Sequence, residues 1–433
     1  MKGGIVIAMF LQSQGVIMTE NALSTEQINK KKFYILICGV LTFFLTSMAK
    51  VLIPNTIFTD LQKLGLEADR ISSLGAAFLY SYAASQLLIG CFSDRYGGVR
   101  VLLIGGSLFS TGTILFPLLP VDQYYLMIFF RLITGFGAGT IFLGVAKLLG
   151  DLYSEKFGMA LGCVLFISYL GPTTGTVPMV KLVEVAGWKP AMILPGILAA
   201  IATSTILLLR KGTIKPITSG QNLAPLFVML KSRSMWFLCF SCATVYGAYY
   251  SVVGQIGNKA MTDMFHIPST KAAIFLMVLT LIVALNNMGV NLLLKLFCGR
   301  RKLVLITGVI ASAAGVVLAY CGFRSTCGAV FFFASGILLA FPAGFFPMFS
   351  IVAKEINKPE HMGMAVAFLN FMAFVFISLY QNIVGWILKG YPVNRETLAF
   401  PVEAYSSSYL FFMIGAVVSL IAVFFVPETK NGK

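Results

Sequence analysis

Long apolar runs recur along the whole chain and are separated by short polar segments. An α-helix needs roughly 20 apolar residues to cross the hydrocarbon core of a bilayer, which is about 30 Å thick. Twelve runs of about this length are present, near residues 33–55, 71–91, 101–119, 124–150, 157–182, 188–209, 234–256, 272–297, 303–321, 329–352, 362–388 and 407–426. The pattern predicts an all-α integral membrane protein with twelve transmembrane helices.

A polar, basic stretch at residues 210–233 separates the first six runs from the last six. It divides the chain into a cytoplasmic tail at 1–32, a six-helix bundle at 33–209, a cytoplasmic linker at 210–233, a second six-helix bundle at 234–427 and a tail at 428–433. Two sets of six helices around a linker are typical of transporters built from two repeats, which bind their substrate at the repeat interface. The apolar patch at residues 5–11 is too short to span and lacks a cleavage site, so we do not interpret it as a signal peptide.

Composition agrees with a chain whose solvent is the lipid bilayer, because 58% of the 433 residues are hydrophobic and only 11% are charged. The net charge of +16 is distributed unequally between the two sets of loops. Segments on the side of the N-terminus carry 20 Lys and Arg against 8 Asp and Glu, whereas the opposite loops carry 9 against 8. This asymmetry places both termini in the cytoplasm and accounts for the charge without a nucleic-acid partner. We expect a monomer in a bacterial inner membrane.

The chain shows no sign of catalytic or metal chemistry. Cys239 and Cys242 form a CxxC, but the only histidines, His266 and His361, lie in predicted loops away from it. No catalytic triad or phosphate-binding loop is visible. The sequence therefore predicts a protein that is not an enzyme and needs no cofactor or metal.

The loop after the second predicted helix carries a motif that indicates a function. It reads Gly90-Cys-Phe-Ser-Asp94-Arg95-Tyr96-Gly97-Gly98-Val99-Arg100 and resembles the G-x-L-A-D-R-x-G-x-x-R signature of the major facilitator superfamily. The resemblance implies two pseudo-symmetric six-helix bundles and a gate between them, with gating residues Gly90, Asp94, Arg95, Gly97, Arg100 and, at the end of the fourth helix, Asp151. The matching loop of the second half, residues 295–302, lacks an acidic residue, so a second latch is not expected there.

Glycines in the fourth and fifth helices indicate close packing. Arg131, Gly135 and Gly139 look like the superfamily's R-x-x-x-G motif, and their spacing of four residues places both glycines on one face, where a neighbouring helix can approach. Gly171 and Pro172 partly resemble the Gly-Pro kink of proton-coupled exporters. Proton-coupled efflux of drugs or metabolites is therefore an alternative function.

The second helix is similar to that of the anion:cation symporter branch of the superfamily. Phe78-Leu-Tyr80-Ser-Tyr82-Ala-Ala-Ser-Gln86 runs into Gly90 as in the branch pattern F-x-W-x-Y-x-x-x-Q-x-x-x-G. Lys50 stands where that branch places a substrate-binding arginine, and Gly187-Trp188-Lys189 resembles its G-W-R. The resemblance implies transport of organic anions such as sugar acids and phosphate esters.

Lys50 and Arg131 are the charges that matter most, because they fall within predicted spans while all 16 acidic residues fall in loops, tails or helix ends. A cation in the membrane is costly and usually faces a cavity or a partner. Lys50 has the alternative of reaching toward the membrane surface, and Arg131 that of bonding to carbonyls of the second helix. If they face a cavity, a carboxylate or phosphate on a small substrate compensates them.

The remaining candidate binding residues are uncharged. Tyr82 and Gln86 are proposed from the second helix, and Tyr246 and Tyr250 share a face of the seventh helix. Asn286 and Asn287 interrupt the eighth helix, and Asn370 the eleventh. Amide and phenol groups bind polar substrates, but they also join helices to one another, and both interpretations remain.

The coupling ion is left open by the sequence. Proton-coupled members of the branch carry acidic residues in the first and fourth helices, where this chain has Ala49 and Ala138. Glu184, near the end of the fifth helix, is a poor substitute. The leading hypothesis is a secondary transporter for a small, polar, anionic metabolite, working by alternating access with a proton, sodium or an exchanged anion. A transporter-like ligand sensor is the alternative from another class.

Overall fold

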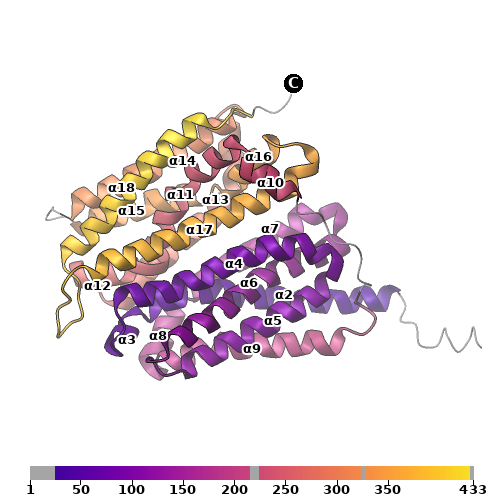
Figure 1. The fold of residues 1–433 in the computed structure, drawn as a ribbon, viewed down its shortest axis with the longest axis horizontal. Helices are drawn as coiled ribbons and strands as arrows, with labels where there is room; N and C mark the ends of the chain where they lie inside the picture. The colour runs from indigo at the N-terminus through magenta and orange to yellow at the C-terminus, as the bar shows by residue number, and fades with distance from the viewer. Residues whose placement is uncertain (1–24, 215–223, 324, 326–327, 430–433) are drawn as a thin grey trace, which may run out of the picture.

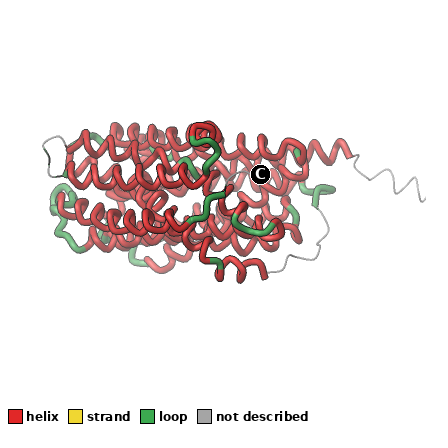
Figure 2. The backbone as a smooth tube through the Cα atoms, turned by 90° about the horizontal axis from the view of Figure 1, so that it is seen from above, coloured by secondary structure: helices red, strands yellow, loops and turns green. Residues whose placement is uncertain are grey.

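The computed structural model describes residues 25–214, 224–323, 325 and 328–429, without the side chains of residues 25, 54–55, 89–95, 158, 224 and 291. Helices make up nearly all of this part of the chain, which contains no strand (Figure 2). The first half contains α2 (Thr25–Val51), η1 (Leu52–Thr56), α3 (Phe58–Lys63), α4 (Ala68–Tyr96), α5 (Gly98–Leu115), η2 (Phe116–Leu118), α6 (Tyr124–Leu152), η3 (Ser154–Lys156), α7 (Phe157–Thr174), α8 (Val177–Ala186) and α9 (Trp188–Leu209).

The second half follows a short helix, α10 (Ala224–Lys231), in the segment predicted to be a linker. It contains α11 (Arg233–Ser251), η4 (Val252–Ile256), α12 (Gly257–Phe265), α13 (Ser269–Leu296), α14 (Arg301–Gly322), α15 (Gly328–Ala343), α16 (Phe346–Glu355), η5 (Pro359–His361), α17 (Met362–Lys389) and α18 (Val402–Phe425). Figure 1 shows the helices of the first half, indigo to magenta, lying together beside those of the second half.

Eleven helices or helix pairs of the described chain are long and apolar enough to cross a membrane. The second predicted span corresponds to α4, which has 29 residues and is more polar than the others. Its polar side chains are accommodated because α4 packs against α6 of its own half and against α17 of the other half. The fold is the predicted all-α membrane architecture of two six-helix bundles, and α4 lies at the centre of the contact between them.

Several spans are interrupted, which the apolar pattern did not show. The fifth predicted span is two helices, α7 and α8, and the tenth is α15 and α16. Two five-residue π-helical segments, η1 and η4, follow α2 and α11. Because a π-helical turn inserts an extra residue, it changes the direction of the side chains around it. The first helix also begins at Thr25, eight residues before the predicted span at residue 33.

Direct contacts between side chains join the two halves on one side of the molecule. We call it the distal side, because it lies away from the described ends of the chain, and the opposite side the proximal side (Figure 1). On the distal side Lys389 at the end of α17 pairs with Glu67 (2.8 Å) and Asp69 (2.9 Å) at the start of α4. Gln255 of η4 donates to Ser72 of α4 at 2.6 Å. The distal side is therefore closed by direct contacts between the halves.

Candidate substrate site between the two halves

Lys50 lies in the last turn of α2, immediately before the π-helical segment η1. Its Nζ atom is 4.0 Å from the centre of the Tyr82 ring and 5.2 Å from that of Phe374. The two rings contact each other edge to face at 4.7 Å. Because Tyr82 belongs to α4 and Phe374 to α17, the ammonium group lies against one ring from each half and points toward the interface between the halves.

The surroundings of the Lys50 ammonium group contain aromatic rings but no opposite charge. The side chain is half-buried. No described residue accepts a hydrogen bond from it, and none forms an ion pair with it. Each ring offers an attraction of about 0.5 to 2 kcal/mol, whereas burial of an ion costs several kcal/mol. An anionic group arriving here finds an ammonium that has no competing partner in the described chain.

Uncharged polar side chains join the two halves at the depth of Lys50 and beyond it. Gln86 of α4 accepts a hydrogen bond from Asn370 of α17, so these two candidates from different halves are in direct contact. Two further amides reach phenols of the first half: Asn287 to Tyr169 at 2.9 Å and Asn382 to Tyr80 at 3.4 Å. The phenols of Tyr82, Tyr169 and Tyr250 also interact electrostatically with one another. Asn287 was a candidate from the sequence, whereas sequence reasoning missed Tyr169 and Asn382 as partners across the interface.

Arg131 occupies a different position from Lys50. Its Nε donates to the carbonyl oxygen of Leu74 at 3.2 Å, and its guanidinium carbon lies 4.7 Å from the Phe78 ring and 5.7 Å from the Phe116 ring. The residue is 1% exposed, and neither Nη atom has a partner among the described residues. This geometry matches the alternative of a cation bonded to a carbonyl of the second helix. Arg131 and Lys50 contact different rings of α4.

The glycines of α6 allow α6 and α4 to pack closely. A Cβ atom on Gly135 would overlap the carbonyl oxygen of Phe78, and one on Gly139 would lie 2.6 Å from that of Tyr82. The predicted face for a close neighbour is therefore occupied by α4. In α7, a Cβ on Gly171 would lie 2.9 Å from the backbone nitrogen of Met48 in α2. The break after α7 at residues 175–176 follows Pro172 by three residues.

The candidate residues of the second half divide into two groups. Tyr246 packs between Phe346 (5.8 Å) and Phe349 (5.9 Å), and its buried hydroxyl has no partner among the described residues. Asn286 donates to the carbonyl oxygen of Phe341 at 3.2 Å, which joins α13 to α15 within the second half. Asn286 thus has the helix-joining contact that the sequence left open, whereas its neighbour Asn287 reaches the other half.

The gating motif is only partly described. The side chains of Gly90, Asp94 and Arg95 lie outside the described residues. Gly97 has φ of 73° directly before α5, a conformation that favours glycine. Arg100 and Asp151 form no ion pair with each other, and Nη1 of Arg100 is buried with no partner in the described chain. The predicted contact between them is therefore not made in this conformation.

The second half nevertheless contains an ion pair that we did not predict from the sequence. Arg301, in the first residue of α14, pairs with Glu355, the last residue of α16, at 3.1 Å. Its acid comes from the end of another helix, which is why inspection of residues 295–302 missed it. By position this pair is the counterpart of Arg100 and Asp151.

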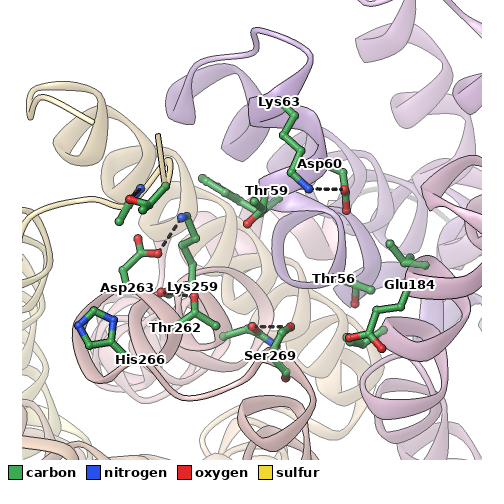
Figure 3. Close-up of a pocket in the computed structure, with 16 residues that line it drawn as sticks. Thr56, Thr59, Asp60, Lys63, Glu184, Lys259, Thr262, Asp263, His266 and Ser269 are labelled. Carbon is green, nitrogen blue, oxygen red and sulfur yellow. Dashed lines mark hydrogen bonds and ion pairs between the residues drawn. The ribbon is translucent and has the colours of Figure 1, made fainter. Parts of the chain in front are cut away.

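A cavity of about 560 Å³ opens on the distal side between α3, α8 and α12 (Figure 3). Its wall contains an ion pair between Lys259 and Asp263 of α12 at 2.7 Å, with both side chains 5% exposed. Asp263 also accepts from the Tyr405 hydroxyl (2.7 Å) and the Phe400 backbone nitrogen (2.9 Å). Glu184 lines the same cavity. The sequence did not reveal that Asp263 is buried, because it lies close to the end of its helix.

The described residues contain no group of three or more His, Cys, Asp or Glu side chains arranged to hold a metal ion. Cys239 and Cys242 are buried free thiols one helical turn apart, and the Cys242 Sγ donates to the Cys239 carbonyl oxygen at 3.1 Å.

The chain is similar in sequence to known transporters. Over 178 residues the chain is 26% identical to a probable chloroplastic anion transporter 4 of Oryza sativa subsp. japonica, a match that covers 41% of this chain and 30% of the relative. Over 172 residues it is 24% identical to a probable sulfoacetate transporter of Cupriavidus necator, covering 40% of each chain. The chain thus aligns with less than half the length of these curated relatives.

Solved structures share the fold over almost the whole chain. A mutant form of the nucleoside transporter NupG superposes with a TM-score of 0.71 at 17% identity, covering 91% of this chain and 99% of the other. A D-xylose–proton symporter gives 0.66 at 15% identity, covering 92% and 98%. The family model of the Major Facilitator Superfamily matches residues 35–297. This chain therefore belongs to the major facilitator superfamily.

Proposed function

We propose that this transporter carries a small, polar anion across the membrane by alternating access, and that Lys50 is the group that binds the negative charge. The observation that carries the proposal is the position of the ammonium group against Tyr82 and Phe374, one ring from each half, without a described counter-charge. A residue in contact with both halves senses which side of the carrier is open. The probable anion and sulfoacetate transporters among the relatives support the same class of cargo.

The remainder of the proposed site recognises hydroxyl and carbonyl groups. Gln86 and Asn370 hydrogen-bond to each other, and Tyr82 and Tyr250 place phenols near them. These groups are neutral, so they add hydrogen bonds for a polar substrate without changing the charge of the site. Tyr246 has an unused hydroxyl in the described chain and is the remaining candidate of the second half.

Arg131 has a supporting role in this proposal. Its guanidinium faces Phe78, which stacks on Tyr82 at 6.3 Å with an interplanar angle of 14°. The ring of Tyr82 therefore contacts both Phe78 and the ammonium group of Lys50. We therefore expect Arg131 to hold α4 in place next to the site, and to bind the anion only if α4 moves.

The distribution of charge between the loops indicates which side of the protein faces the cytoplasm. With the basic loops in the cytoplasm, the distal side faces outward and the proximal side faces inward. In this arrangement the structure has its outer side closed by Lys389, Glu67 and Asp69. A bacterial inner membrane and a monomer remain our expectation for the working protein.

The test is ligand-induced stabilisation of the purified protein against heat. Sulfoacetate, gluconate and inorganic phosphate serve as anions, glucose and uridine as neutral ligands, and choline as a cation. A hydrogen bond to a charged group contributes about 1.5 to 3 kcal/mol, so Lys50→Met should weaken binding of the stabilising anion by about 10- to 150-fold. Lys63→Met is the matched control, because Lys63 is a distal lysine with an exposed side chain whose described ion pair is with Asp60 of its own helix.

Two results would contradict the proposal. Stabilisation of the wild type by glucose, uridine or choline alone would show that the cargo is not an anion. Equal anion affinity in Lys50→Met and the wild type would show that the negative charge binds elsewhere.

A further inference from the structure

Uptake of an anion needs a source of energy, and the described interior offers few groups that exchange protons. Moving one negative charge inward against a negative-inside potential costs about 2.3 kcal/mol per 100 mV. The buried carboxylate Asp263 lies at the distal end of α12 and is already paired with Lys259. His266 follows the last residue of α12, and His361 is the last residue of the short helix η5. In the described part of the chain, Lys50 is the basic group placed where the halves meet.

The titratable neighbours of Lys50 are phenols. Lys50 contacts Tyr82 of α4, and Tyr82 interacts in turn with Tyr169 of α7 and Tyr250 of α11. The described acidic and basic residues of α4 lie at its ends, and α17 has only Lys389, at its last residue. In α5 and α9 the charged residues are confined to the first turn, and η1 and η4 have none. Arg131 of α6 faces Phe78 instead.

The net charge of this site depends on two ligands, a proton on the amine of Lys50 and the bound anion, and each strengthens the binding of the other. An ammonium group alone is compensated only by two aromatic rings, whose contribution of at most a few kcal/mol falls short of the cost of burying an ion. An anion alone, beside a neutral amine, is equally uncompensated. When the amine is protonated and the anion is bound, the two charges cancel. Binding of the anion and binding of the proton therefore increase each other's affinity by the same factor.

We propose that Lys50 is also the proton carrier of this transporter, so that one proton and one monoanion bind and leave together. The inference rests on the proposed function of Lys50 as the anion site. On the distal side, the lone pair of the neutral amine takes a proton from water, and the resulting ammonium group pairs with an oxygen of the anion. The ion pair of Lys50 and the anion has no net charge, and in this form the carrier changes from open on the distal side to open on the proximal side. On the proximal side the anion leaves, and the ammonium group returns its proton to water there.

This proposal names the substrate class as monoanions. With one ammonium group in the site, a monoanion gives a net charge of zero and a dianion leaves an uncompensated negative charge at a depth where charge is costly. It also explains how Ala49 and Ala138 are tolerated at positions where proton-coupled relatives of the branch carry acids. In this proposal Lys50 alone binds both the anion and the proton.

The decisive variant is Lys50→Arg. A guanidinium group keeps its positive charge at every physiological pH, so it retains attraction for the anion but cannot release a proton. The measurement is uptake of radiolabelled gluconate by proteoliposomes under an imposed gradient of one pH unit, acidic on the distal side. The wild type should accumulate gluconate about tenfold, because one pH unit is worth 1.36 kcal/mol for a one-to-one symporter. Lys50→Arg should exchange labelled for unlabelled gluconate but accumulate none.

A second measurement on the wild type makes the test independent of how well the variant folds. A pH-sensitive dye inside the vesicles should report one proton entering with each gluconate, and a potential of about 60 mV set with potassium and valinomycin should leave the accumulation unchanged. An uncoupled monoanion carrier would respond to that potential by about tenfold. Lys63→Arg is the control and should behave as the wild type.

The outcomes separate this inference from the proposed function. Net accumulation by the wild type without proton entry, or full accumulation by Lys50→Arg, overturns Lys50 as the proton carrier while leaving it as the anion site. Absence of exchange with gluconate, sulfoacetate and phosphate, together with absence of stabilisation by any of them, overturns both.

Discussion

The buried ion pair of Lys259 and Asp263 allows a quantitative prediction about the second half. Asp263 accepts three hydrogen bonds, from Lys259, Tyr405 and the Phe400 backbone nitrogen, and Lys259 also donates to the Leu398 carbonyl oxygen at 2.7 Å. These contacts connect α12 to α18 and to the segment before it. Removing one member of a buried pair leaves the other charge uncompensated, at a cost of about 3 to 5 kcal/mol in the free energy of unfolding.

The perturbation is Asp263→Asn and Lys259→Met, made singly and together. One kcal/mol corresponds to about 2 to 4 °C in melting temperature for a unit of this size, so each single variant should melt about 6 to 20 °C lower. The double variant removes both charges and should melt no lower than the worse single variant. The assay is the loss of the monodisperse chromatographic peak after heating in detergent. Additivity of the two single effects within about 0.5 kcal/mol would refute the reasoning, because it would mean that the two charges do not interact.

Two further predictions concern the packing and the closure of the halves. Gly139→Leu should abolish the folded protein, because its side chain would overlap Ser85 and the Tyr82 carbonyl, whereas Gly162→Leu, where an added Cβ meets nothing within 4 Å, should be tolerated in the same chromatographic assay. Lys389→Met removes the described ion pairs that join α17 to α4 on the distal side, so a cysteine introduced at Tyr250 in a cysteine-free background should react faster with an impermeant maleimide added on that side. An unchanged rate would show that those ion pairs do not hold the distal side closed.

Hydropathy predicted the helices well because bilayer thickness imposes their length. The predicted span at 188–209 coincides with α9, and the span at 362–388 differs from α17 by a single residue. The break after α7 follows the Gly171-Pro172 pair, which the sequence marked as a candidate kink. The break at Gly344 was not predicted, because it lies within an apolar run that reads as continuous. A break in a helix changes hydrogen bonding rather than composition, so the apolar pattern carries little trace of it.

The sequence predicted individual residues of the candidate site but not which residues contact each other. Lys50 was identified because a cation in an apolar run is rare, but Phe374, its partner ring, lies in the other half and no local pattern connects the two. Arg131 gave the same sequence signal and yet bonds to Leu74 inside the first half. The direction in which a charged side chain points depends on which helix packs against it. Sequence spacing alone does not contain that information.

The two π-helical segments preserve a trace of how such a chain arose. η1 reads Leu-Ile-Pro-Asn-Thr and η4 reads Val-Val-Gly-Gln-Ile, so their residues share almost nothing. They nevertheless follow the first helix of each half and contact each other across the molecule. A duplicated ancestor with one such irregularity would leave two copies in these places. The deformation of the backbone has then outlasted the residues that first produced it, which makes helix geometry a longer-lived record of common descent than sequence.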